Sequence, residues 1–212
     1  MAKGKQIMGT VIVLFILVGF PAISYLYLKN GYEYRKEVIG TQEDLGPMPD
    51  LSGLPALRGE LPANLRGKMT MVGWLDPNRP DAAQRYGATL DSLYQQFENS
   101  PNLYFTTIVR GADQEQTVRD FTSQHQLPAV EMLSFLAAEP AAFRQTAAAF
   151  GITPPEAAGA EAIVALVDSS LTIVKHYNLS ERSQTIGLVQ LIASIIPLKE
   201  RPDIVVNRQR EL

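Results

Sequence analysis

The sequence predicts an α/β domain built on a mixed sheet with helices on both faces, preceded by one N-terminal transmembrane helix. The chain has 212 residues, 46% hydrophobic and 19% charged, which is enough for one globular domain and an appendage. Residues 7–28 carry no charge. Beyond residue 40, short apolar runs typical of buried strands alternate with stretches of helical periodicity.

The uncharged N-terminal segment runs from Ile7 to Leu28 and would span about 33 Å as a helix, which matches the core of a bilayer. Tyrosines and basic residues follow it, as is typical of a membrane interface. The alternative is a cleaved signal peptide ending near Ala22-Ile23-Ser24, although the apolar run exceeds the usual signal length of about 7–15 residues. We expect residues 1–30 to form a single-pass anchor in the cell's inner membrane, with the domain on the periplasmic or extracytoplasmic side.

The composition excludes several function classes. The chain has no cysteine, which rules out disulfides, thiolate catalysis and zinc–thiolate sites. Its formal net charge is −3, and beyond residue 40 the sequence holds 14 basic and 20 acidic residues, a balance of −6. An acidic domain of this kind has no electrostatic reason to bind nucleic acid or an anionic membrane surface.

The order of elements follows from apolar patterning and from turn residues. Residues 41–67 are rich in proline and glycine, so they cannot form a long helix, and we expect a linker over 31–48. The predicted strands are short apolar runs bounded by turn residues: 69–75, 103–109, 162–167 and 171–177. The predicted helices have apolar residues at three- and four-residue spacing or clear start and stop signals: from an Asp81 cap to the stop at Ser100, 114–126, 139–150, and from a Ser180 cap to Ile196. We place the domain at 49–198 and a C-terminal tail at 199–212.

A family resemblance rests on the order of these elements and on local text. Pro49-Asp50-Leu51 and the segment LPANLRGK at 61–68 precede the first long strand. The segment from Arg119 to Leu136 and the helix end Ala149-Phe150-Gly151-Ile152 add to the pattern. Together with the membrane anchor, they resemble the thioredoxin-like proteins of SCO type. The resemblance covers about residues 47–197 and implies a thioredoxin-like fold.

The same resemblance indicates where the reactive turn of the family would lie, and the reactive residues of the family are absent there. SCO proteins deliver copper to cytochrome oxidase through a turn with two cysteines and a histidine before the final hairpin. In this chain the turn runs from Trp74 to Arg79, and Asp76-Pro77 stands where the first Cys-Pro would be. The residues of the turn that we select for a contact are Trp74, Asp76, Pro77, Asn78 and Arg79. The histidine would be expected near residues 159–162, which read GAEA. We therefore expect no metal, no cofactor and no catalytic residue. An Asp76–Arg79 ion pair is one interpretation of the turn, and a structural role of these residues in the geometry of the turn is the favoured one.

The remaining metal-binding residue types are better explained by structure. Met69 and Met71 alternate on a predicted strand and more often indicate core packing than a copper site. His125 stands at a helix end, where a cation interacts favourably with the dipole, and His176 is expected on the surface of a strand.

The sequence leads to three function hypotheses, of which the first is the preferred one and the other two are its rivals. The first is a non-catalytic, membrane-anchored SCO-like protein that acts by contact, as an assembly factor or accessory subunit of a respiratory terminal oxidase, through the turn Trp74 to Arg79. The second is an enzyme or small-molecule-binding domain that uses Asp76, Asn78 and Arg79 in place of the thiols. The third is a general periplasmic tether without an oxidase partner.

Overall fold

A computed structural model describes residues 13–111, 113–153 and 161–196. The chain divides into two compact units, residues 1–41 and 42–212, which are described separately.

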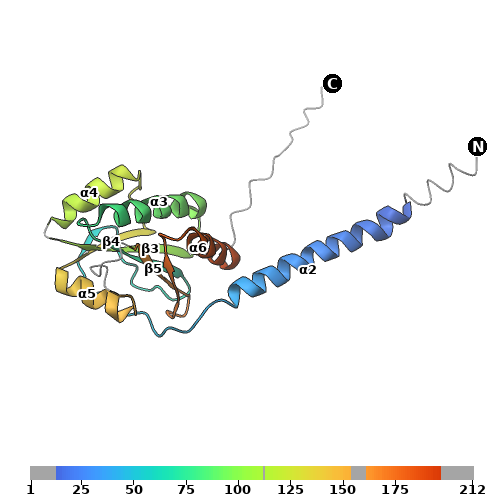
Figure 1. The fold of residues 1–212 in the computed structure, drawn as a ribbon, viewed down its shortest axis with the longest axis horizontal. Helices are drawn as coiled ribbons and strands as arrows, with labels where there is room; N and C mark the ends of the chain where they lie inside the picture. Colours follow the sequence, from blue (N-terminus) through green and yellow to red (C-terminus); the bar gives the residue numbers. More distant parts are fainter. Residues whose placement is uncertain (1–12, 112, 154–160, 197–212) are drawn as a thin grey trace, which may run out of the picture. The chain divides into compact units, whose positions relative to one another are not determined.

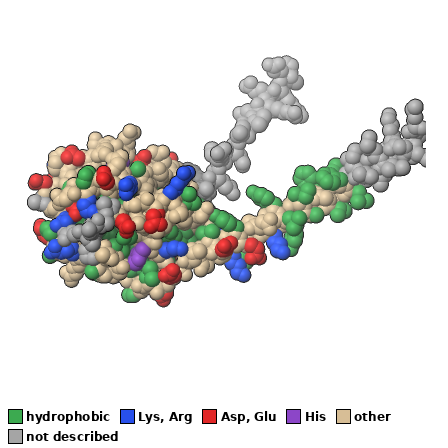
Figure 2. Space-filling view, viewed as in Figure 1, with side chains coloured by type: hydrophobic (Ala, Val, Ile, Leu, Met, Phe, Trp, Pro, Cys, Tyr) green, Lys and Arg blue, Asp and Glu red, His purple; other side chains and the backbone are tan. Residues whose placement is uncertain are grey.

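The described part of the first unit is helical. A π-helical turn, η1 (Phe15–Gly19), leads into α2 (Phe20–Ile39), in which Pro21 occupies the first turn. None of the side chains of these two elements is buried, and Figure 2 shows hydrophobic side chains along the first part of the helix and charged ones further on. Within the described residues, no helix combines the length and the apolar character that crossing a membrane requires. The structure does not describe positions 1–12. The span predicted from Ile7 to Leu28 therefore begins outside the described residues.

The second unit contains a six-stranded mixed sheet in the order β1-β4-β3-β2-β5-β6. Its three central strands, β2, β3 and β4, are parallel, and β1, β5 and β6 join antiparallel. The strands are β1 (Ala56–Arg58), β2 (Met69–Leu75), β3 (Leu103–Arg110), β4 (Leu133–Ala138), β5 (Ile163–Val167) and β6 (Ile173–Asn178). The four strands predicted from apolar runs are confirmed within two residues at their ends.

Two strands were not predicted. β4 reads LSFLAA, which has no β-branched residue and ends in two alanines directly before a helix start, so the sequence alone gave no strand signal. β1 has only three residues and lies in the proline-rich lead-in. Both are strands because they pair with neighbours distant in sequence: β4 lies parallel to β3, and β1 pairs with the outer edge of β4. The predicted set of strands was therefore incomplete on this side of the sheet.

Helices cover both faces of the sheet, as predicted. Figure 1 shows α3 (Pro80–Phe97) and α4 (Gln114–Gln124) on one side and α5 (Pro140–Ala149) on the other. α6 (Arg182–Ile195) packs on β6, where Gly187 faces the ring of Tyr177. In β2 the alternation of a strand sends Met69 and Met71 toward α3, and both methionines are buried. The core-packing interpretation of the two methionines is therefore confirmed.

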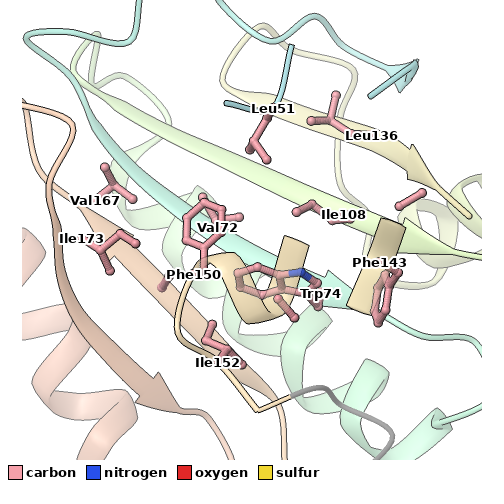
Figure 3. Close-up of a cluster of buried hydrophobic side chains, with 13 residues drawn as sticks. Leu51, Val72, Trp74, Ile108, Leu136, Phe143, Phe150, Ile152, Val167 and Ile173 are labelled. Atoms are coloured by element: carbon pink, nitrogen blue, oxygen red, sulfur yellow. The ribbon is translucent and has the colours of Figure 1, made fainter. Parts of the chain in front are cut away.

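The face covered by α5 is a continuous apolar cluster, shown in Figure 3. It combines side chains of all the long strands and of α5 with Leu51 from the lead-in. The lead-in is held by antiparallel backbone hydrogen bonds to the start of β6, among them Leu45 N to Ile173 O at 2.9 Å. Pairing of this kind fixes where the chain enters the domain.

Two predicted helix caps are wrong. Arg79 is the N-cap of α3 and Pro80 its first residue, which places Asp81 inside the first turn. Glu181 is the N-cap of α6, and the Ser180 hydroxyl instead accepts hydrogen bonds from Arg85 Nη1 at 3.1 Å and from the Ala162 amide at 3.4 Å. Ser180 therefore connects α3, β5 and the start of α6.

Candidate functional site

The turn after β2 is organised by the Asp76 carboxylate. Asp76 is only 5% exposed. Its Oδ1 accepts hydrogen bonds from the Asn78 amide at 3.0 Å and from Asn78 Nδ2 at 3.1 Å, and its backbone oxygen accepts one from the Arg79 amide at 3.0 Å. These bonds form an Asx turn, a local geometry that aspartate and asparagine favour. Asp76 therefore has a structural role in this corner.

The second carboxylate oxygen of Asp76 is held by an arginine from the neighbouring strand. Arg110 Nη1 donates to Asp76 Oδ2 at 2.7 Å. The sequence suggested Arg79 as the ion-pair partner and did not single out Arg110. The missed signal was register: Leu75 pairs with Val109 across two parallel strands, so the residues that follow them meet at the same edge of the sheet.

Trp74 points to the opposite face of the sheet from Met71 and packs into the cluster of Figure 3. Its ring meets that of Phe150 edge to face, with centroids 5.2 Å apart. The residue is 8% exposed, and its Nε1 has no hydrogen-bond partner among the described residues. Trp74 therefore lies under the turn, and little of it is available for contact with a partner.

The exposed part of the turn consists of Pro77, Asn78 and Pro80, with Arg79 partly exposed. The turn thus brings together all five residues that the sequence selected, but in two layers. Trp74 and Asp76 support it from below, while Pro77, Asn78 and Arg79 form its surface. Of the four positions 159–162, where the resemblance places a histidine, only Glu161 and Ala162 lie within the described residues.

A groove of about 510 Å³ opens beside the turn, between the first turns of α3 and one face of α4. We call it the α3–α4 groove. Pro77 and Pro80 of the turn belong to its wall, so the groove and the exposed turn form one continuous surface. Its other lining residues are Leu75, Asp81, Ala83, Gln84, Thr117, Asp120, Phe121, Gln124 and His125.

His125 differs from the prediction in its surroundings. It is the C-cap of α4, as its position at a helix end predicted, but it is only 8% exposed and rests against the Phe121 ring with centroids 4.9 Å apart. Burial lowers its pKa, although the Asp91 charge acts in the opposite direction. The expectation of an imidazolium stabilised by the helix dipole is therefore wrong.

His176 was expected on the surface and is instead half-buried on β6. Its Nε2 is buried and has no hydrogen-bond partner among the described residues. Burial lowers its pKa, while a hydrogen bond with the Phe150 backbone and the Glu43 charge raise it. Both histidines of the chain therefore favour the neutral form when the protein is folded.

This environment predicts a loss of stability in mild acid. The unfolded chain binds protons on both histidines below their ordinary pKa of about 6.5, whereas the folded chain resists protonation. The unfolded state then holds more protons, so the free energy of unfolding falls as the pH drops below about 6.5. We expect a lower Tm at pH 5.5 than at pH 7.5, measured by circular dichroism. The variant His125→Gln/His176→Gln should lose most of that difference, and an unchanged Tm in the unmodified protein would contradict the prediction.

The absence of copper binding remains a prediction from the sequence. A tight Cu(I) site needs thiolate, thioether or imidazole ligands brought together, and the chain has no cysteine and only two histidines. We expect the full-length protein to yield Cu(I) completely to a chromophoric chelator such as bathocuproine. One retained equivalent of copper would overturn this expectation.

Comparisons with known proteins bear on the fold. No protein-family model and no curated protein matches this chain. Among solved structures, BsSco, a member of the Sco family of cytochrome c oxidase assembly proteins, is similar with a TM-score of 0.52 and 16% identity, over 73% of this chain and 97% of its own. A putative protein disulfide isomerase from Bacteroides thetaiotaomicron has the same TM-score, with 19% identity over 73% of this chain and 89% of its own. At such identities the likeness shows the fold alone: the chain has a thioredoxin-like fold of the kind that Sco proteins share.

Proposed function

We propose that this protein is a membrane-anchored, thioredoxin-like contact protein without catalytic activity, and that its partner is a respiratory terminal oxidase complex, as an assembly factor or an accessory subunit. The observation that carries the proposal is the set of bonds that the Asp76 carboxylate makes in the turn after β2. At the corner where the SCO resemblance places a pair of cysteines, this chain has a carboxylate engaged in holding the turn together.

The bonds of Asp76 support a contact role over the rival enzyme. Asp76 Oδ1 accepts two hydrogen bonds and Oδ2 receives Arg110, and the residue is almost fully buried. A carboxylate that acts as a general acid or base must reach the substrate proton within hydrogen-bond distance. The surface that a partner meets consists of Pro77, Asn78 and the partly exposed Arg79, which suits recognition by shape.

The anchor and the oxidase partner rest on the sequence. The uncharged run from Ile7 to Leu28 has the length of a bilayer crossing, and the tyrosines after it suit a membrane interface. The oxidase follows from the SCO resemblance, and the similarity in fold to BsSco, itself a member of a family of cytochrome c oxidase assembly proteins, is consistent with it.

The test is affinity purification of the full-length protein from detergent-solubilised membranes of its source, followed by mass spectrometry. We expect subunits of a terminal oxidase to be enriched. The variant Pro77→Asp changes the exposed surface of the turn and should reduce that enrichment at least fivefold. Pro101→Asp is the matched control, because Pro101 is an exposed residue in the turn before β3, away from Asp76, and it should leave the enrichment unchanged.

The alternatives give different outcomes. An enzyme would keep its partners in the variant Asn78→Ala/Arg79→Ala and lose turnover of a small molecule. A general tether would be recovered with membrane proteins unrelated to an oxidase. Equal loss in the Pro77 and Pro101 variants would contradict a contact through the turn.

A further inference from the structure

His176 of β6 connects the end of α5 to the sheet by a hydrogen bond. We propose that His176 is a pH-sensitive switch: its neutral imidazole holds the end of α5 on β6, and its protonated imidazole releases that end and weakens the packing beneath the Asp76 turn. The switch is a property of this domain by itself. Its use, to control the contact that the turn makes, rests on the proposed function.

The bond joins the imidazole to the backbone of Phe150, the residue that caps the C-terminal end of α5. This bond raises the pKa of His176, as it does when the imidazole donates, so the acceptor is the Phe150 oxygen. Nε2 is buried and has no hydrogen-bond partner among the described residues, which leaves Nδ1 as the donor. In the neutral ring, Nδ1 therefore carries the proton and Nε2 is an acceptor without a bond.

The segments around the ring offer little to stabilise a positive charge. Ala165 of β5, which is in register with His176, is fully buried. On the side of α5 the ring meets Gly151, where a Cβ would lie 3.5 Å from the His176 Cε1. Along β6, Lys175 and Tyr177 point to the opposite face of the sheet by the alternation of a strand, and Lys175 Nζ lies 5.7 Å from the centroid of the Tyr177 ring.

Glu43 of the lead-in supplies the charge that acts on the imidazole. Its amide donates to the Val174 oxygen at 2.9 Å, two residues before His176, so the exposed Glu43 lies beside the same strand. This carboxylate favours the protonated form of the imidazole, which burial disfavours.

Protonation changes what the ring needs from its surroundings. It places an N–H on Nε2, at a buried position where the described part of the chain provides no acceptor. A buried donor without a partner is costly, and a buried charge is more so. The imidazolium therefore turns toward Glu43 and water, and this movement breaks the bond to the Phe150 oxygen.

The end of α5 supports the Asp76 turn through an aromatic contact. The Phe150 ring is 1% exposed and meets the Trp74 ring edge to face, with centroids 5.2 Å apart; both rings are labelled in Figure 3. Trp74 lies two residues before Asp76, beneath the turn. Release of the Phe150 backbone therefore weakens the packing on which the turn rests.

The test uses Trp74 as a reporter, because it is the only tryptophan in the sequence. Its fluorescence emission is followed from pH 8 to pH 5 in the full-length protein in a zwitterionic detergent. We expect one reversible shift to longer wavelength, with circular dichroism unchanged and a midpoint below about pH 6.5, because burial lowers the pKa of His176. An emission maximum that stays constant over this range would overturn the switch.

Two variants assign the transition to one histidine. His176→Gln keeps a side-chain donor for the Phe150 oxygen but does not titrate, so its emission should stay at the neutral-pH position throughout. His125→Gln removes the other histidine and should keep the transition. A transition that persists in His176→Gln, or one that is lost in His125→Gln, would overturn the assignment.

A further pair of variants tests the part played by Glu43, which a merely structural histidine would not reveal. Glu43→Gln removes the charge that favours the imidazolium, so the midpoint should move to lower pH. Glu98→Gln makes the same change in net charge at the C-cap of α3 and should leave the midpoint where it is. Equal midpoints in Glu43→Gln and in the unmodified protein would overturn the proposed movement toward Glu43.

The outcomes separate the switch from the proposed function. The fluorescence measurements need no partner, so their failure overturns the switch and leaves the proposed function standing. Equal recovery of the oxidase above and below the midpoint of the transition would reject control of the contact by His176. A transition without any oxidase in the purification at pH 7.5 would reject the proposed partner and leave the switch standing.

Discussion

Replacing Asp76 with alanine is expected to lower the free energy of unfolding by about 3 kcal/mol. The change removes the carboxylate to which Arg110 Nη1 donates at 2.7 Å, and it leaves the amide and Nδ2 of Asn78 without their acceptor. The Asp76 side chain is 3% exposed and that of Arg110 20%, so water only partly replaces the lost interaction. Urea denaturation of the full-length protein measures the effect.

A double-mutant cycle isolates the pair from the turn. Asp76→Asn keeps an oxygen in place for Asn78 and removes the charge, so it should cost less than alanine. Combined with Arg110→Gln, it should cost less than the sum of the two single changes, because both partners of the ion pair are then neutral. Additive costs would show that the contact between Asp76 and Arg110 contributes nothing of its own to stability.

Replacing Gly73 with alanine is expected to have the larger effect, about 4 kcal/mol. A Cβ at position 73 would lie 2.4–2.5 Å from the ring and hydroxyl of Tyr86, a fully buried residue that α3 presents to β2. Overpacking of a core costs about 1–3 kcal/mol. A shift of the ring would also break the hydrogen bond between the Tyr86 hydroxyl and Thr107 Oγ1, 2.7 Å long and buried, for about 1–3 kcal/mol more.

The comparison for this variant is Gly53→Ala. A Cβ at Gly53 meets no atom within 4 Å, and its backbone is not in the left-handed region, so the change should stay within about 0.5 kcal/mol. The same denaturation experiment gives both values. Similar midpoints for the Gly73 and Gly53 variants would mean that the Tyr86 ring yields freely, contrary to the packing described.

The sequence predicted those parts of the fold that depend on local pattern. β2 carries seven successive buried residues, and its bounds followed from an apolar run between turn residues. α5 followed from Pro140 at its start and Gly151, with φ of +71°, after its end. β4 depends instead on pairing with β3, a contact between distant segments that composition does not encode.

The sequence predicted where the turn lies in the chain, but it did not predict the contacts that the residues of the site make. The five residues of the turn lie within six successive positions, 74–79, so the sequence selected them together. Arg110 joins them only through the register of β2 and β3, and the burial of His125 depends on the missing side chain of Gly87 on another helix. Both are consequences of tertiary packing, which a single sequence shows only when strand register is worked out explicitly.

The path of the lead-in also determines the distance between the point where the chain enters the domain and the Asp76 turn. Leu45 and Gly46 bond to Ile173, which is level with Val167 and, across the sheet, with Thr70 of β2. Asp76 lies six residues after Thr70, directly past the end of β2, about 20 Å further on at roughly 3.3 Å per residue. The polypeptide thus joins the domain at one rim of the sheet, and the Asp76 turn lies at the other. Under the proposed contact role, lengthening the chain around Thr41 would extend the distance that the turn can cover, without disturbing the hydrogen bonds that Asp76 makes.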